Sequence, residues 1–329
     1  MSWRRVTARF ESARLRLCAA LAAAGAIACA SSPEIDPRYR PSASALEIIA
    51  VLERHVPDDT YRFEPARDFT DRNVYRSSLL RLENLEQLHA DALRAGHLDG
   101  AIAFAKARSL ERLRAYDLAA DAYHIAAERE PALRAEALRS ADLCEALDRA
   151  LAAPSPLAPA ESAGGVLAVP APAAALEAFE RRAARLEEIA ATAEGSHHAA
   201  VVAEEIERAD LERARYFVRL RDVIPDGELR AVSELERVAL NHGDSKLAAR
   251  HLLALADLYA ELSIEYVQQH PPEGLRFDPS RFRDLVDAGA RLYEMVAARD
   301  GTPEKLEAAR RLEAFLAFSL SIDRDRFTP

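Results

Sequence analysis

The sequence predicts an all-α protein built from antiparallel helical hairpins. Apolar residues recur at intervals of three and four along most of the chain, and no segment shows the alternation of apolar and polar residues typical of a β-strand. Half of the 329 residues are apolar, 30% are charged and only 11 are glycine. This composition supports a large helical core with few special turns, and the longer helices are expected in the C-terminal half.

Residues 1–28 are predicted to be a signal peptide rather than part of the fold. Several arginines precede an uncharged stretch from Leu17 to Ala28, which at about a dozen residues is too short to span a bilayer as a helix. Small residues then lead to Cys29, an order that resembles the signal of bacterial lipoproteins, although Ala26 stands where leucine is usual. The alternative is ordinary signal peptidase cleavage after Ala28 or Ala30, which yields a soluble periplasmic or secreted protein.

The lipoprotein resemblance implies that Cys29 is acylated and attaches the protein to the outer membrane from the periplasm, because Ala30 rather than aspartate follows it. Residues 29–44 are then a polar, proline-containing tether. Once the signal is removed, two cysteines remain, Cys29 and Cys144. Because Cys29 is the acylation site, Cys144 has no cysteine to pair with, and we expect no internal disulfide. Cys144 lies on the apolar stripe of a predicted helix, where we expect a core thiol rather than a nucleophile.

An N-terminal helical region is predicted over residues 45–152. Prolines and glycines mark the ends of its segments. The predicted helices are Ala45–His55, Val74–Arg94, Asp99–Leu113, residues 115–130 and Pro131–Ala152.

The fourth of these helices resembles the second helix of a tetratricopeptide repeat. Ala119, Tyr123, Ala126 and Pro131 fall at the positions of the A-x3-F, A and P pattern of that repeat. Two helices approach closely where small side chains face each other, and the aromatic ring fills the space that they leave. The tryptophan and Leu-Gly positions of the repeat are absent from the preceding helix. An alanine-rich helix pair outside the family is the alternative.

Residues 153–173 are rich in alanine and proline and are predicted to be a linker. A C-terminal helical-hairpin region over residues 174–329 follows it. Its first two helices flank Gly195-Ser196 and should pair as a long hairpin, with Arg213 interrupting the apolar stripe of the second. Further helices are predicted over residues 245–269, 279–298 and 303–322, the last two begun by a capping residue and a proline.

Motifs for enzyme chemistry are missing from the sequence. It contains no glycine-rich phosphate loop, no H-E-x-x-H and no paired cysteines for zinc, so we expect no catalytic residue and no cofactor. The sequence offers one candidate metal site, Glu86-x-x-His89 together with Asp121-x-x-His124, because helical bundles bind metals through paired Glu-x-x-His motifs. Aspartate replaces glutamate in the second motif, and His124 should point away from the helix interface, so no metal site is expected.

Two adjacent histidines, His197 and His198, begin a predicted helix. Their side chains project about 100 degrees apart on a helix and need a third ligand from elsewhere to hold a metal. We interpret the pair as a solvated helix start.

The resemblance to the tetratricopeptide repeat implies protein binding. The net charge of −10 disfavours binding to nucleic acid. We therefore expect a non-enzymatic scaffold or assembly factor of the bacterial cell envelope that holds an envelope protein or peptide segment. One alternative is a structural envelope lipoprotein that forms homo-oligomers. The other is a metal-binding helical-bundle enzyme that uses Glu86 and His89.

Overall fold

A computed structural model describes residues 40–61, 71–152 and 172–327. These ranges contain eleven helices and no strand, which confirms the all-α class. No helix within them is long and apolar enough to cross a bilayer. The predicted signal peptide, Cys29 and most of the linker lie outside the described residues. The helices are α2 (Pro41–Tyr61), α3 (Val74–Ala95), α4 (Asp99–Arg112), α5 (Tyr116–Arg129), α6 (Arg134–Leu151), α7 (Pro172–Ala193), α8 (His198–Arg219), α9 (Gly227–Asn241), α10 (Ala248–Gln269), α11 (Pro279–Ala297) and α12 (Glu304–Phe327).

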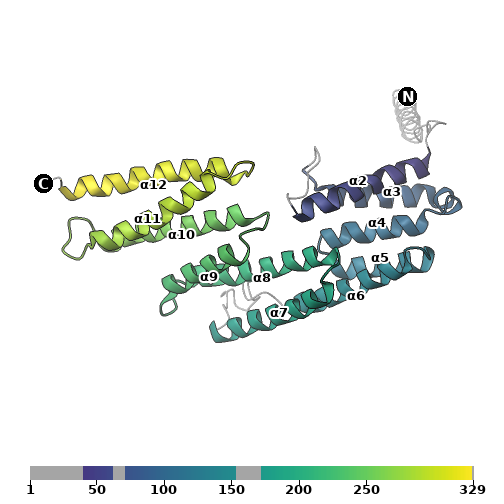
Figure 1. Cartoon of the computed structure of the whole chain (residues 1–329), viewed down its shortest axis with the longest axis horizontal. Coiled ribbons are helices and arrows are strands. Elements are labelled where there is room, and N and C mark those ends of the chain that lie inside the picture. The colour runs from purple at the N-terminus through teal and green to yellow at the C-terminus, as the bar shows by residue number, and fades with distance from the viewer. Residues whose placement is uncertain (1–39, 62–70, 153–171, 328–329) are drawn as a thin grey trace, which may run out of the picture.

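The helices form an elongated array in which each packs against the next. In Figure 1, α2 to α6 form one stack and α7 to α12 form a second. Within the second stack, α8 lies next to the first. Contacts also join α2 to α4, α6 to α8 and α10 to α12. Alternate helices therefore lie on the same side of the array, as expected for stacked hairpins.

Several helix boundaries differ from the predicted ones. α2 begins at Pro41, four residues earlier than predicted, and continues past Pro57 to Tyr61. α6 begins at Arg134 rather than Pro131, and α7 includes the last two residues of the predicted linker. Proline suits the first turn of a helix, which is consistent with the start of α2. Whether a helix such as α2 continues past a proline depends on its packing against other helices, which the local sequence does not encode.

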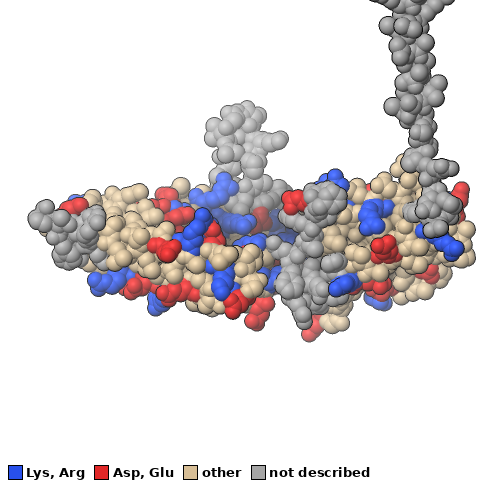
Figure 2. Space-filling model, turned by 90° about the horizontal axis from the view of Figure 1, so that it is seen from above, with Lys and Arg blue, Asp and Glu red and all other residues tan. Residues whose placement is uncertain are grey.

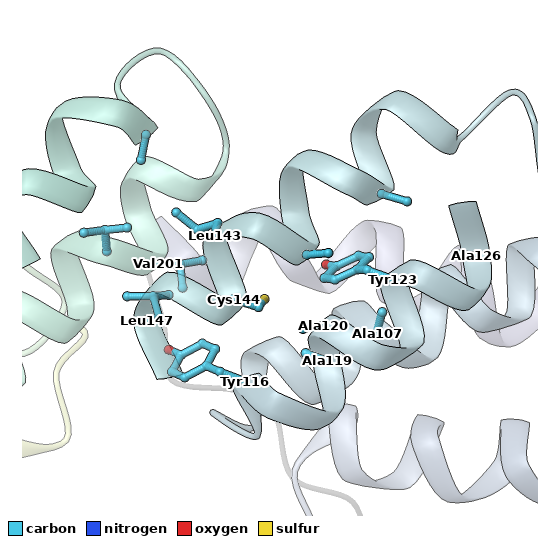
Figure 3. Packing of buried hydrophobic residues seen from close by; sticks show 14 of the residues in the cluster. Ala107, Tyr116, Ala119, Ala120, Tyr123, Ala126, Leu143, Cys144, Leu147 and Val201 are labelled. Carbon is cyan, nitrogen blue, oxygen red and sulfur yellow. The ribbon is translucent and has the colours of Figure 1, made fainter. Parts of the chain in front are cut away.

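The α4–α5 hairpin packs around residues that the sequence singled out. Ala119, Tyr123 and Ala126 have no exposed surface, and Figure 3 shows them in the core with Cys144. The Tyr123 ring meets that of Phe104 edge-on, with centroids 5.4 Å apart. The close helix contact is thus present, whereas assignment to the tetratricopeptide family stays a prediction. Pro131 lies in the turn that follows α5.

One core cluster includes residues from both sides of the predicted linker. It joins buried side chains of α4, α5 and α6 to Leu186 and Ala193 of α7 and to Val201 and Val202 of α8. Apolar burial at about 25 cal/mol per Å² makes such a cluster a main source of stability. The N-terminal and C-terminal helical regions therefore share a hydrophobic core.

Replacing Ala119 with leucine should overpack the α4–α5 interface. Because Ala119 has no exposed surface, the added atoms force neighbouring helices apart, and we expect Ala119→Leu to lower the free energy of unfolding by about 1–3 kcal/mol. Urea denaturation followed by circular dichroism measures this change. Ala135→Leu, at an exposed position of α6, is the matched control and should change stability by less than about 0.5 kcal/mol. Equal stability of the two variants would contradict the close packing.

Candidate functional site

The first candidate site is a hollow that we call the inner groove. It lies on one side of the array, where alternate helices lie next to one another. It has a volume of about 410 Å³ and lies between α2, α4 and the start of α6. The odd-numbered helices α3 and α5 pack behind these helices and fix their spacing. The residues that line the inner groove are Ile49, Leu52, Glu53, Ala101, Phe104, Ala105, Arg108, Leu133 and Glu136.

The inner groove has an apolar floor and an acidic rim. The guanidinium of Arg108 lies over the Phe104 ring, 5.4 Å from its centroid. Arg108 is itself paired, through Nη2 with Glu136 Oε1 at 3.2 Å and through Nη1 with Glu111 Oε1 at 3.5 Å. Glu53 is exposed on the opposite side. The groove therefore offers a hydrophobic surface bordered by negative charge, because the positive charge of Arg108 is already paired with carboxylates.

A second hollow adjoins the inner groove, and we call it the histidine cleft. It has a volume of about 350 Å³ and is formed by α6, the end of α7 and the α7–α8 corner. Glu136 lines both hollows. The residues that line the histidine cleft are Glu136, Arg139, Asp142, Leu143, Ala146, Thr192, Ala193, Ser196, His197 and His198.

The histidine pair is only partly solvated, so the sequence interpretation is wrong for one of its members. His197 is exposed, but His198 retains only 6% of its accessible surface because the start of α8 packs against α6. The Nε2 atom of His198 lies 3.2 Å from Ser140 Oγ, whereas its Nδ1 atom has no hydrogen-bond partner. Burial, together with the charges of Arg108 and Arg139, lowers the pKa of His198 to about 4.

Glu111 is a buried carboxylate at the end of α4, with 1% of its surface exposed. The hydroxyl of Tyr123 donates to Glu111 Oε2 at 2.8 Å, so the core tyrosine is satisfied. Glu111 Oε1 accepts no hydrogen bond. Burial and the charge of Glu111 raise the pKa of the Cys144 thiol, whose Sγ lies 4.0 Å from Oε2. Cys144 is thus a buried, protonated thiol, as expected for a core cysteine.

The structure does not bring together any three of the four residues weighed as metal ligands, Glu86, His89, Asp121 and His124. Glu86 of α3 pairs instead with Lys106 Nζ at 2.9 Å. His124 of α5 pairs with Glu145 of α6 at 3.2 Å. Each side chain reaches the neighbouring helix rather than a common centre.

A different trio meets at the histidine cleft. Within the described ranges, one group of three potential metal ligands has its ligand atoms within 4.8 Å of one another, and it consists of Glu111, His197 and His198. Sequence reasoning missed Glu111. The sequence did contain a signal for this residue. Glu111 continues the buried stripe of Ala103 and Ala107 at intervals of four, so it places a charge on a helix face that is otherwise apolar and packed.

A charged junction beside these hollows joins α8 to the α4–α5 corner. Arg114 donates through Nε and Nη2 to the two carboxylate oxygens of Glu205, each at 2.7 Å, and the Tyr116 hydroxyl donates to Oε1 at 2.8 Å. Burial raises the pKa of Glu205, but the hydrogen bonds and charge of Arg114, with Arg208, hold it below its usual value. Arg114 adopts a φ of 64°, a left-handed conformation unfavourable for a residue with a Cβ.

Neighbouring carboxylates of α8 extend this junction to the α9–α10 corner. Glu204 pairs with Arg112 at 3.1 Å and with Lys246 at 2.7 Å. Glu207 accepts from Ser245 Oγ at 2.5 Å and contacts His251 Nε2 at 2.5 Å. Figure 2 shows basic side chains gathered in the hollowed middle of the face that it presents. α8 therefore binds elements from both stacks through its acidic side chains.

No protein-family model matches this chain, and no curated protein matches its sequence.

Removing the guanidinium of Arg114 should weaken the junction. Arg114→Ala leaves the buried Glu205 carboxylate without two charged hydrogen bonds, and we expect the free energy of unfolding to fall by about 1.5–3 kcal/mol. Chemical denaturation measures this loss. Arg114→Gly should be less harmful than Arg114→Ala by roughly 1 kcal/mol, because glycine accepts the left-handed conformation.

Arg94→Ala is the matched control for Arg114→Ala. Arg94 pairs with Asp91 on the surface, where the two side chains are 64% and 98% exposed, so its removal should cost less than about 1 kcal/mol. A loss for Arg114→Ala as small as that for Arg94→Ala would show that the junction contributes little stability.

Proposed function

We propose that the protein is a non-enzymatic interaction scaffold of the bacterial cell envelope whose inner groove receives a segment of an envelope partner. The observation that carries the proposal is the inner groove itself, an apolar hollow of about 410 Å³ between α2, α4 and α6. Stacked hairpins present such surfaces because alternate helices line one side of the array. The groove is suited to holding a partner by burial of apolar surface.

The charges around the inner groove define the partner's chemistry. Glu53 and Glu136 border the apolar floor, and Arg108 is engaged by Glu111 and Glu136. The complementary ligand is a peptide segment with an apolar side chain flanked by lysine or arginine. Opposite charges at the rim favour encounter and orientation, whereas the apolar contact supplies affinity.

The proposed location depends on the first 30 residues of the sequence. A basic stretch, an apolar stretch and small residues before Cys29 favour acylation of that cysteine and attachment to the outer membrane. Several acyl chains would hold the protein firmly, since a single chain binds a membrane only marginally. The tether would then present the helical array to partners in the periplasm.

Blocking the inner groove should abolish partner capture. Ala101 is a partly exposed residue of α4 that lines the groove, so Ala101→Arg adds bulk and a positive charge that repels a basic segment. We expect cross-linking and affinity capture from envelope fractions of the native host, read by mass spectrometry, to recover a defined partner with the wild type. Recovery should fall at least tenfold with Ala101→Arg.

Ala135→Arg is the matched control for Ala101→Arg, because Ala135 is exposed on α6 and does not line the groove. It should capture the partner as well as the wild type does. Equal capture by both variants would exclude the inner groove as the binding surface. Recovery of the bait with itself and nothing else would support the structural homo-oligomer.

Acylation is tested separately. In cells of the native host, Cys29→Ala should move the protein from the membrane fraction to the soluble fraction and abolish incorporation of labelled fatty acid, because the variant lacks the thiol that is acylated. Fractionation and labelling of the wild type and the variant measure both effects. A wild type that is soluble and unlabelled would support cleavage by ordinary signal peptidase.

A further inference from the structure

Three potential metal ligands from distant parts of the chain converge at the edge of the histidine cleft. Glu111 lies in the last turn of α4, whereas His197 caps and His198 begins α8. One ligand atom of each lies within 4.8 Å of the others. The imidazole rings of the two histidines have centroids 3.6 Å apart. Ligand atoms around a tetrahedral zinc ion with bonds of about 2.0–2.1 Å are about 3.3 Å apart. A small side-chain adjustment therefore brings the trio to coordination distance.

Two buried polar atoms of this trio have no hydrogen-bond partner. His198 Nδ1 and Glu111 Oε1 are both buried and accept no hydrogen bond, although Glu111 Oε1 is ion-paired with Arg108 Nη1 at 3.5 Å. Nδ1 lies 3.9 Å from Glu111 Oε2, too far for a hydrogen bond. Unsatisfied buried polar atoms are costly and uncommon in native proteins. A cation held between the imidazole and the carboxylate would give His198 Nδ1 the partner that it lacks.

The surrounding side chains orient the trio as the supporting groups of a metal site do. Ser140 Oγ lies 3.2 Å from His198 Nε2. A neutral imidazole that donates its Nε2 hydrogen to Ser140 carries its lone pair on Nδ1, the atom that faces Glu111. The Tyr123 hydroxyl donates to Glu111 Oε2 at 2.8 Å. Metal ligands are commonly fixed in this way by hydrogen bonds from outside the coordination sphere.

The charged groups near the trio carry both signs. Glu111, Glu136 and Asp142 supply three carboxylates, against the guanidinium groups of Arg108 and Arg139. Arg108 is paired with two of these carboxylates. With both histidines neutral, the formal charge of this set is negative by one. Arg108 and Arg139 oppose a positive charge at His198, so a divalent ion here would be held by its three ligand atoms rather than by the surrounding charges.

We propose that Glu111, His197 and His198 form a binding site for a divalent transition-metal ion of the zinc class. Two imidazole nitrogens and one carboxylate oxygen are ligands that zinc accepts. Because His197 is exposed and lines the histidine cleft, the fourth coordination position faces that cleft and is open to water or to a small ligand. This site is separate from the sequence candidates Glu86, His89, Asp121 and His124.

Metal titration of the purified full-length mature protein, without a polyhistidine tag, tests the site. After treatment with a chelator and buffer exchange, Zn²⁺ alone is titrated in competition with a chromophoric chelator. We expect one equivalent of Zn²⁺ per chain. His197→Ala and His198→Ala should each weaken binding at least tenfold, and Co²⁺ should give a visible absorption spectrum of tetrahedral type that both variants lose.

Matched controls separate this site from other histidines and from unfolding. His89→Ala and His124→Ala should bind Zn²⁺ as the wild type does. His197 is exposed, so without metal His197→Ala should have the circular dichroism and melting temperature of the wild type. Loss of Zn²⁺ binding by this variant would then result from the missing ligand and not from unfolding. Unchanged binding in folded His197→Ala, or binding lost in His89→Ala or His124→Ala instead, would overturn the proposal. Failure of the metal site would leave the inner groove and its partner unaffected.

Discussion

The ion pair of Arg114 with Glu205 connects the two stacks of the array beside the hydrophobic core that they share, and together these contacts hold the array in its elongated form. The two residues are 91 positions apart, yet both carboxylate oxygens of Glu205 accept from one guanidinium. Glu204 and Glu207 continue the same junction toward the α9–α10 corner. Glu205 is buried, and a buried carboxylate that loses hydrogen-bond donors is costly, so the junction constrains where α8 can lie. Because the histidine cleft includes the start of α8, that constraint also positions His198 against α6.

The inner groove and the histidine cleft are linked through two charged residues. Glu136 lines both hollows, and Arg108 joins Glu136 to Glu111. Under the two proposals, a segment in the groove and an ion at the trio would act on the same carboxylates. Binding at one site would then change the electrostatic surroundings of the other, because charges this close interact strongly in a partly buried environment.

The sequence predicted part of this arrangement and missed part of it. The spacing of Ala119, Tyr123 and Ala126 indicated a close helix contact, and the structure buries all three. Small and aromatic residues at helical intervals can be recognised locally, since each helix face is defined by a few turns. His198 was misinterpreted as solvated because its burial is produced by α6, whose Ser140 is 58 residues away in the sequence. The sequence also did not predict that Glu86 and His124 each pair with a different neighbouring helix.

The sequence by itself determined the helical class, most helix boundaries and the small-residue packing of the α4–α5 hairpin. Each of these depends on local periodicity and on residues that stop a helix. The tertiary structure alone decided that Arg114 meets Glu205, that Glu111 faces His198 and that α2, α4 and α6 enclose a groove. Such contacts are set by the angles and register between packed helices, which are collective properties of many side chains and are not encoded in the spacing of any one segment.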